Sequence, residues 1–253
     1  ENYDKLFKEN ELYDRYKEIQ KVLSDLKNAG HEVILVSSGA IGMGVGKLGL
    51  TEKPTDIPTK QAAAAVGQCE LMYRYDKLFA EYHHTVAQIL LTADDIYDAR
   101  RSRYVHDTLT RLLEWHALPV INENDAVATD EIGIQTTIGE NDSLSAIVAK
   151  LVKADLLVLL SDIDGLYTAD PRKKPDATLI SDVYELDEGI MSLGGGAGST
   201  VGTGGMITKL HAAKIATENG CDMIITNGTK PELLYCILDG MPVGTRFFKR
   251  DTK

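Results

Sequence analysis

Cysteine is scarce in this sequence, and the few cysteines present form no pattern. The 253 residues include three, Cys69, Cys221 and Cys236, which are far apart and form no C-x-x-C pair. An odd number of scattered cysteines provides neither a disulfide framework nor a cysteine zinc site. Unpaired cysteines are typical of a reducing compartment, and we therefore expect a cytoplasmic protein.

Long apolar runs are also absent. No stretch approaches the roughly 18 consecutive apolar residues that a membrane-spanning helix requires. The first ten residues, ENYDKLFKEN, are charged and lack the apolar centre of a signal peptide. We therefore expect no membrane association.

Positive charge is in deficit. There are 27 Lys and Arg against 38 Asp and Glu, which gives a formal net charge of −11. An acidic protein repels nucleic acid, so none is expected as a partner, and any phosphate must be held by local groups. The six histidines show no H-x-x-x-H spacing, so we interpret them as surface or packing residues and predict no metal ligands in the protein.

What the sequence does contain is an alternation of short apolar strands and longer amphipathic helices. The predicted strands span residues 33–37, 86–91, 118–121, 156–160, 223–226 and 243–247. The predicted helices span 11–29, 59–82, 102–116, 143–152 and 206–218, with a short one from 231. Uniformly apolar strands between helices indicate a mostly parallel sheet with helices on both faces, an α/β fold.

Polar residues follow four of these strands. The segments are Ser37–Ala40, Asn122–Asp125, Ser161–Gly165 and Asn227–Gly228. Ligands of open α/β sheets bind beyond the carboxyl ends of the strands, so we expect a site at one edge of one sheet. Ordinary polar turns are the alternative for any single segment.

A glycine-rich segment, Gly202–Lys209, leads into the helix at 206–218. Glycines let the backbone approach a phosphate, and a helix N-terminus offers free N–H groups to it. Lys209, one turn into the helix, is placed to reach a terminal phosphate. The alternative is a flexible loop followed by a solvated lysine.

Two other segments have simpler interpretations. Gly44–Gly49 matches G-x-G-x-x-G, but it does not begin at a strand end, so we do not interpret it as a dinucleotide site. Gly139–Ser143 opens a helix, where Asn141 or Asp142 can act as an N-cap. Three consecutive polar side chains exceed what capping needs, so a ligand or lysine partner is also expected there.

Together these segments resemble a known family. VSSGAIG (36–42), PVINENDAVAT (119–129), GENDSLSAIVA (139–149), LLSDIDGLYTADPR (159–172) and GTGGMITKLHAAKIA (202–216) are similar to the bacterial gamma-glutamyl kinases, or glutamate 5-kinases, of the amino-acid kinase superfamily. The resemblance runs from about residue 20 to the end. It implies a three-layer α/β/α fold and transfer of the ATP γ-phosphoryl group to the side-chain carboxylate of L-glutamate, the first step of proline biosynthesis.

The resemblance also implies roles for single residues. It assigns catalysis to Lys209 and to Asp142, which orients phosphate-binding lysines. It assigns substrate binding to Ser38, Asp125 (near the α-ammonium) and Asn141, and we expect the strand-end residues Gly39, Ala40 and Asn122 to join them. It assigns ATP binding to Ser161, Asp162, Thr203, Gly204, Gly205, Met206, Ile207, Thr208 and Lys209. ATP with Mg²⁺ is the implied cofactor pair, and a homo-oligomer coupled to glutamyl phosphate reductase is the implied assembly.

The sequence departs from the family in two places. The family's N-terminal strand, with its K-x-G phosphate-binding lysine, has no counterpart after Glu1, and we expect that strand to lie upstream of this residue. No counterpart of the PUA domain of many relatives follows, so we expect one amino-acid kinase domain over 1–253. Two alternatives remain, a weak or inactive regulatory protein that binds ATP and glutamate, and a kinase for another small carboxylate.

Overall fold

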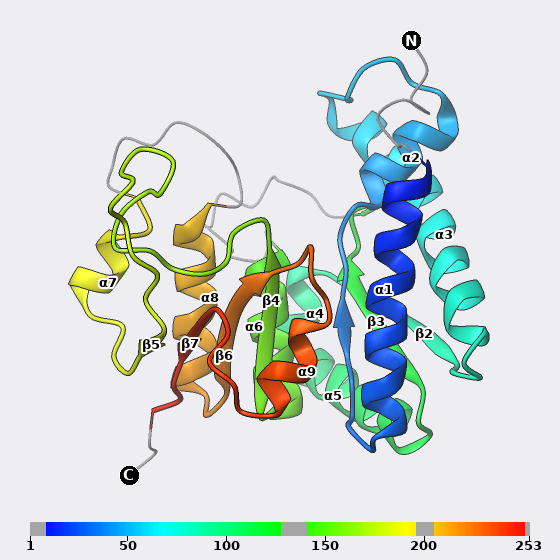
Figure 1. Ribbon diagram of the computed structural model, residues 1–253. Helices are drawn as coiled ribbons and strands as arrows, with labels where there is room; N and C mark the ends of the chain where they lie inside the picture. Colours follow the sequence, from blue (N-terminus) through cyan, green and yellow to red (C-terminus); the bar gives the residue numbers. More distant parts are fainter. Residues whose placement is uncertain (1–8, 128–140, 196–204, 251–253) are drawn as a thin grey trace. The chain divides into compact units, whose positions relative to one another are not determined.

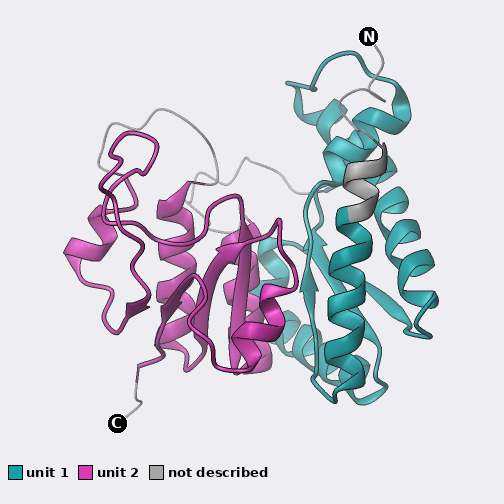
Figure 2. Ribbon diagram, viewed as in Figure 1, with its two compact units in different colours: residues 1–136 teal, residues 137–253 magenta. Residues whose placement is uncertain are grey.

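The computed structural model of the protein describes residues 9–127, 141–195 and 205–250. The chain forms two compact units, residues 1–136 and 137–253, which Figure 2 shows in different colours. Each unit is an α/β structure with its own sheet. That the whole chain is one kinase domain stays a prediction.

The elements alternate along the chain much as expected (Figure 1). The first unit contains α1 (Glu9–Asn28), β1 (Leu35–Val36), α2 (Ala40–Leu48), α3 (Ile57–Ala80), β2 (Val86–Leu91), α4 (Ala93–Tyr97), α5 (Ala99–Glu114) and β3 (Leu118–Glu123). The second contains α6 (Asn141–Val152), β4 (Leu156–Ser161), β5 (Asp182–Val183), α7 (Glu188–Ser192), α8 (Met206–Glu218), β6 (Asp222–Asn227), α9 (Leu233–Leu238) and β7 (Thr245–Phe247).

The sheet of the first unit is parallel, in the order β1-β3-β2. Strand β3 is central and buried over nearly its whole length, as its apolar sequence predicts. Strand β1 is shorter than the predicted 33–37 and only half-buried, although an apolar run of this kind is typical of a strand buried on both faces. Among the described residues β1 pairs with β3 alone, which leaves it at an edge of this sheet.

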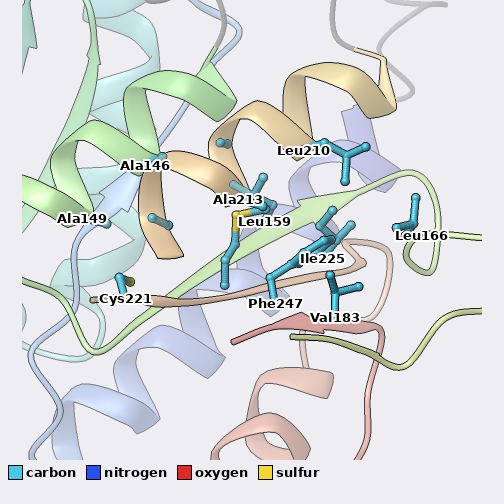
Figure 3. Packing of buried hydrophobic residues seen from close by; sticks show 13 residues of the cluster. Ala146, Ala149, Leu159, Leu166, Val183, Leu210, Ala213, Cys221, Ile225 and Phe247 are labelled. Atoms are coloured by element: carbon cyan, nitrogen blue, oxygen red, sulfur yellow. The ribbon is translucent and has the colours of Figure 1, made fainter. Parts of the chain in front are cut away.

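The sheet of the second unit is mixed, in the order β4-β6-β7-β5. Strands β4 and β6 are parallel, whereas β7 runs antiparallel to β6. Helices α6 and α8 contribute small side chains to the core, which lets them pack closely on β4 and β6 (Figure 3). That cluster is Ala146, Ala149, Leu159, Leu166, Val183, Leu210, Ala212, Ala213, Ala216, Cys221, Met223, Ile225 and Phe247.

Two further predictions need correction. The four polar strand ends do not share one sheet, because two follow strands of the first sheet and two follow strands of the second. Apolar runs identify strands, but strand pairing depends on contacts between distant segments, which the runs do not specify. The expected elements also omitted α2, α4, β5 and α7, which are short or rich in glycine and polar residues.

Helix α2 explains the Gly44–Gly49 pattern. Gly44 lies in the middle of α2, and a Cβ atom there would overlap the carbonyl oxygen of Ala63 in α3. Gly67 of α3 faces the carbonyl oxygen of Ala40 in the same way. The glycines therefore let α2 and α3 pack backbone against backbone.

We expect Gly67→Ala to destabilise the protein, because the new methyl group meets a backbone carbonyl that cannot rotate away. Overpacking of this kind costs about 1–3 kcal/mol or more of unfolding free energy. Gly42→Ala is the matched control, since a Cβ atom at Gly42, also in α2, meets nothing within 4 Å. Urea unfolding followed by circular dichroism measures both variants. Equal stability of the two would contradict the packing argument.

No helix within 9–127, 141–195 or 205–250 combines the length and the apolar character needed to cross a membrane.

Candidate active site

In the first unit, the turn from β1 into α2 presents the predicted substrate residues Ser38, Gly39 and Ala40. Gly39 has φ 100°, a left-handed conformation that favours glycine, and it precedes α2 with no side chain capping the helix. Ser38 and Gly39 are exposed and Ala40 is buried. The first N–H groups of α2 are therefore free of a side-chain cap and suited to bind a carboxylate.

The base of this turn is held by α3. Ser37 is buried, its N–H donates to the carbonyl of Ile121 in β3 at 2.9 Å, and its hydroxyl lies 2.8 Å from the Tyr75 hydroxyl. Burial raises the pKa of Tyr75, so its hydroxyl stays protonated and can share this hydrogen bond. The end of β1 is thus fixed relative to both β3 and α3.

Asn122, at the end of β3, is a second predicted substrate residue. It is 2% exposed, and its Oδ1 accepts a hydrogen bond from the N–H of Glu123 at 2.9 Å. Its Nδ2 donates to Oε1 of Gln68 in α3 at 3.0 Å. Asn122 therefore shapes the turn after β3, and a second α3 side chain fixes that turn.

Asp125 lies on the same turn, three residues beyond Asn122, and is half-buried. Burial raises the pKa of its carboxyl, since a charged carboxylate is less well solvated there. Among the described residues no cation forms an ion pair with it. The turn is therefore suited to a ligand that carries a positive charge.

In the second unit, Asp142 and Lys209 are brought together although they are 67 positions apart. Lys209 Nζ lies 2.9 Å from Asp142 Oδ2, and both side chains are largely buried, at 12% and 20% exposure. The Thr208 hydroxyl donates to the same oxygen at 2.9 Å and is also within reach of the Gly205 carbonyl. Asp142 thus connects the start of α6 to the start of α8.

Helix α8 begins at Met206, the residue predicted from the glycine-rich segment. Gly205 precedes it in extended conformation, without a side-chain cap, and Met206, Ile207, Thr208 and Lys209 form its first turn. This arrangement leaves backbone N–H groups and the lysine at the same helix end, where anions are favoured. Thr203 and Gly204 lie outside the described residues.

The other nucleotide candidates, Ser161 and Asp162, follow β4. The Ser161 hydroxyl donates to Asp162 Oδ1 at 3.2 Å, and Asp162 is exposed. Ser161 is aligned with Asn227 of β6, so these two strand ends share one edge of the second sheet. Asn141 is the first residue of α6, beside Asp142.

The sequence-based prediction missed two contacts in this region and one residue in the first unit. Asn227 Nδ2 donates to Asp164 Oδ1 at 2.8 Å, and the Tyr167 hydroxyl donates to Asp164 Oδ2 at 3.2 Å. Gln68 was missed altogether. Its signal was present, because it falls on the buried face of α3 with Ala64, Leu71 and Tyr75, where a polar side chain needs a reason.

The chain belongs to the amino acid kinase family. The model of that family matches residues 6–227. Solved structures of similar fold include a carbamate kinase from Giardia lamblia bound to AMP-PNP (TM-score 0.65, 14% identity, 94% of this chain and 91% of that one). A second is an isopentenyl phosphate kinase from T. acidophilum in a product complex (TM-score 0.58, 21% identity, 93% of this chain and 90% of that one).

Much more similar relatives bear one name, glutamate 5-kinase. The enzyme from Clostridium perfringens is 54% identical over 233 residues, which cover 92% of this chain and 87% of the relative. Those from Clostridium tetani and Listeria innocua are 57% and 53% identical, each over 89% of this chain, and over 83% and 82% of their own lengths. The family expected from the sequence motifs is thereby confirmed.

Proposed function

We propose that this protein is an ATP-dependent kinase that phosphorylates the side-chain carboxylate of glutamate, as the first step of proline biosynthesis. The structural observation that carries the proposal is the Asp142–Lys209 ion pair at the N-terminus of α8. Such a site favours the phosphates of ATP. The names of the similar enzymes support glutamate as the acceptor.

The chemistry needs no general base. A glutamate carboxylate has a pKa of about 4.3 and is already ionised at neutral pH. One of its oxygens attacks the γ-phosphorus of ATP, the bond from that phosphorus to the β–γ bridging oxygen breaks, and ADP leaves. Catalysis then depends on positioning the two reactants and neutralising charge on the transferred group. Lys209 supplies positive charge, and Asp142, which accepts a hydrogen bond from Thr208, keeps it in place.

The remaining roles concern the substrate and the nucleotide. Ser38, Gly39 and Ala40 would bind a substrate carboxylate, and Asp125 would bind the ammonium group, with Asn141 as a further substrate contact. Asn122 would act by shaping the Asp125 turn. Ser161, Asp162 and the segment from Thr203 to Lys209 would bind ATP.

Mg²⁺ fits this proposal as a companion of ATP. In the part of the chain that the structure describes, no three His, Cys, Asp or Glu side chains converge to hold a metal ion. Mg²⁺ commonly binds through one or two carboxylates together with substrate phosphates, and it neutralises phosphate charge when bound. A homo-oligomer, coupling to glutamyl phosphate reductase and a cytoplasmic location stay predictions.

The direct experiment is hydroxylamine trapping of the acyl phosphate during ATP consumption. We expect a hydroxamate with glutamate, and much slower ATP consumption with aspartate, N-acetylglutamate or UMP as acceptor. A better rate with one of the other acceptors would overturn the substrate. Calorimetric binding of ATP and glutamate without product would instead favour a regulatory protein.

We also expect the KM for glutamate to rise as the pH falls toward the raised pKa of Asp125. Only the ionised carboxylate attracts the substrate ammonium, and a raised pKa brings its protonation closer to neutral pH. The rise should therefore begin above the ordinary carboxyl range of about 4. Initial rates between pH 5 and 8 measure the profile. Asp125→Asn should remove this titration from the KM profile. If the KM of that variant still rises as the pH falls, a group other than Asp125 is responsible.

A further inference from the structure

The Gln68 amide of α3 has a donor that nothing in the described structure uses. Gln68 is 7% exposed, and its Nε2 is buried without a hydrogen-bond partner. Folding strongly disfavours a buried donor that has lost its water and gained no acceptor. Such an atom needs an explanation, which can be a ligand or a bound water.

The hydrogen-bond network determines which end of this amide is free. The N–H of Glu123 can only donate, so the Asn122 atom facing it is the oxygen, Oδ1. The other end of Asn122 is therefore the donor Nδ2, and its partner on Gln68 must be the acceptor Oε1. The orientation of Gln68 is fixed by a backbone group, and Nε2 remains as an available donor.

The position of Gln68 brings this donor to the carboxyl end of β3. Gln68 holds Asn122 at the end of β3, and Tyr75, two turns along α3, holds Ser37 at the end of β1. The adjacent Gly67 packs on Ala40, at the start of α2. The donor thus comes from the same helix face that positions Ser37 and Asn122.

We propose that Gln68 Nε2 donates a hydrogen bond to the α-carboxylate of the bound amino-acid substrate. This inference rests on the proposed function and adds a specificity residue to it. Asn122, which Gln68 contacts, and Asp125 share one turn. The ammonium group that Asp125 would bind is two bonds from the α-carboxylate carbon. The Gln68 amide therefore binds the α-carboxylate of the substrate, and the Asp125 carboxylate binds its ammonium group. The side-chain carboxylate of the substrate is left to react.

The central test is Gln68→Glu. Glutamate at this position keeps an oxygen to accept from Asn122 Nδ2 but replaces the donor with a second oxygen, which repels a carboxylate. We expect the KM for glutamate to rise about 10- to 100-fold, the usual effect of losing a hydrogen bond to a charged group. The KM for ATP should stay unchanged. If Gln68 merely supports Asn122, or if a water satisfies Nε2, the KM for glutamate will stay near that of the unmodified protein.

A substrate analogue tests which carboxylate is bound. Isoglutamine carries an α-carboxamide and retains the reactive side-chain carboxylate. The unmodified protein should prefer glutamate, and Gln68→Glu should shrink or reverse that preference, since its carboxylate can accept from the carboxamide. An unchanged ratio of kcat/KM values between glutamate and isoglutamine would overturn the assignment to the α-carboxylate.

Two further variants guard against a loss of folding. Gln20→Glu makes the same change at a glutamine of α1 that is 2% exposed and lies within 3.5 Å of the Ser24 hydroxyl. Gln20→Glu should lower thermal stability about as much as Gln68→Glu does, without raising the KM for glutamate. Asn122→Asp should make the Gln68 amide turn its Nε2 toward the new carboxylate, which withdraws the donor from the substrate and raises the KM without altering Gln68.

The outcomes separate this inference from the proposed function. Absence of hydroxamate formation by the unmodified protein, with glutamate binding retained in calorimetry, would refute the kinase. The dissociation constant of glutamate for Gln68→Glu would then decide the role of Gln68. Normal turnover of the unmodified protein, with an unchanged glutamate KM in Gln68→Glu, would refute only the role of Gln68.

Discussion

Lys209→Ala is expected to lower kcat by about 10²- to 10³-fold, comparable to the loss of one preorganised transition-state donor. Asp142 holds the Lys209 ammonium group. Lys209 lies at the start of α8, where the negative charge of a phosphate is favoured. The KM for glutamate should change little, since the proposed glutamate residues of the first unit are untouched. Steady-state kinetics with each substrate varied in turn measures both effects.

The matched control is Lys214→Ala, which removes an exposed lysine from the same helix. It should leave both kcat and KM near their original values. Similar losses from the two variants would indicate a general effect of charge on α8. A rise in the KM for glutamate as large as the fall in kcat would contradict the phosphate role of Lys209.

Asp125→Asn is expected to weaken glutamate binding by about 2–5 kcal/mol, the usual effect of removing one partner of a desolvated charge pair. That corresponds to a rise in dissociation constant of roughly 30-fold or more. The half-buried carboxylate has no cation paired with it among the described residues, so the substrate ammonium is the proposed partner. Calorimetric titration with glutamate measures the loss.

The stability of the same variant gives an independent check. Because folding raises the pKa of Asp125, the neutral form is favoured in the folded state, and its ionisation at neutral pH opposes folding. A neutral asparagine should therefore leave unfolding stability unchanged or increase it, while binding falls. Asp76→Asn, at an exposed position of α3, is the control and should affect neither. Loss of stability in Asp125→Asn would point to a structural role instead.

The strands and the phosphate segment were the most predictable features. The strand 86–91 and the helix 206–218 have the predicted bounds. In both cases the residues of the element and those that flank it specify its start and its end locally. The position of Lys209 was also predictable, since it follows a glycine-rich helix start. Its partner Asp142 was expected from the resemblance to a known family, and spacing alone did not indicate the contact.

Non-local contacts were the least predictable. Helix α2 could not be distinguished from a glycine-rich loop, because Gly44 costs helix stability locally and gains it only by packing against Ala63. The separation of the strands into two sheets likewise depends on which strands pair. The contacts of the Asn122 amide with Gln68 and Glu123 were not indicated by its position after β3, and its contact with substrate stays a prediction.

The packing of Gly67 on Ala40 has an evolutionary consequence. The atom opposite Gly67 belongs to the main chain, so no compensating exchange of a side chain in α2 can make room for a larger residue there. Position 67 is therefore expected to accept only glycine in any descendant that keeps the start of α2 where it is. Gly67 would then keep the turn from β1 into α2 in its present geometry while the residues around it change by mutation.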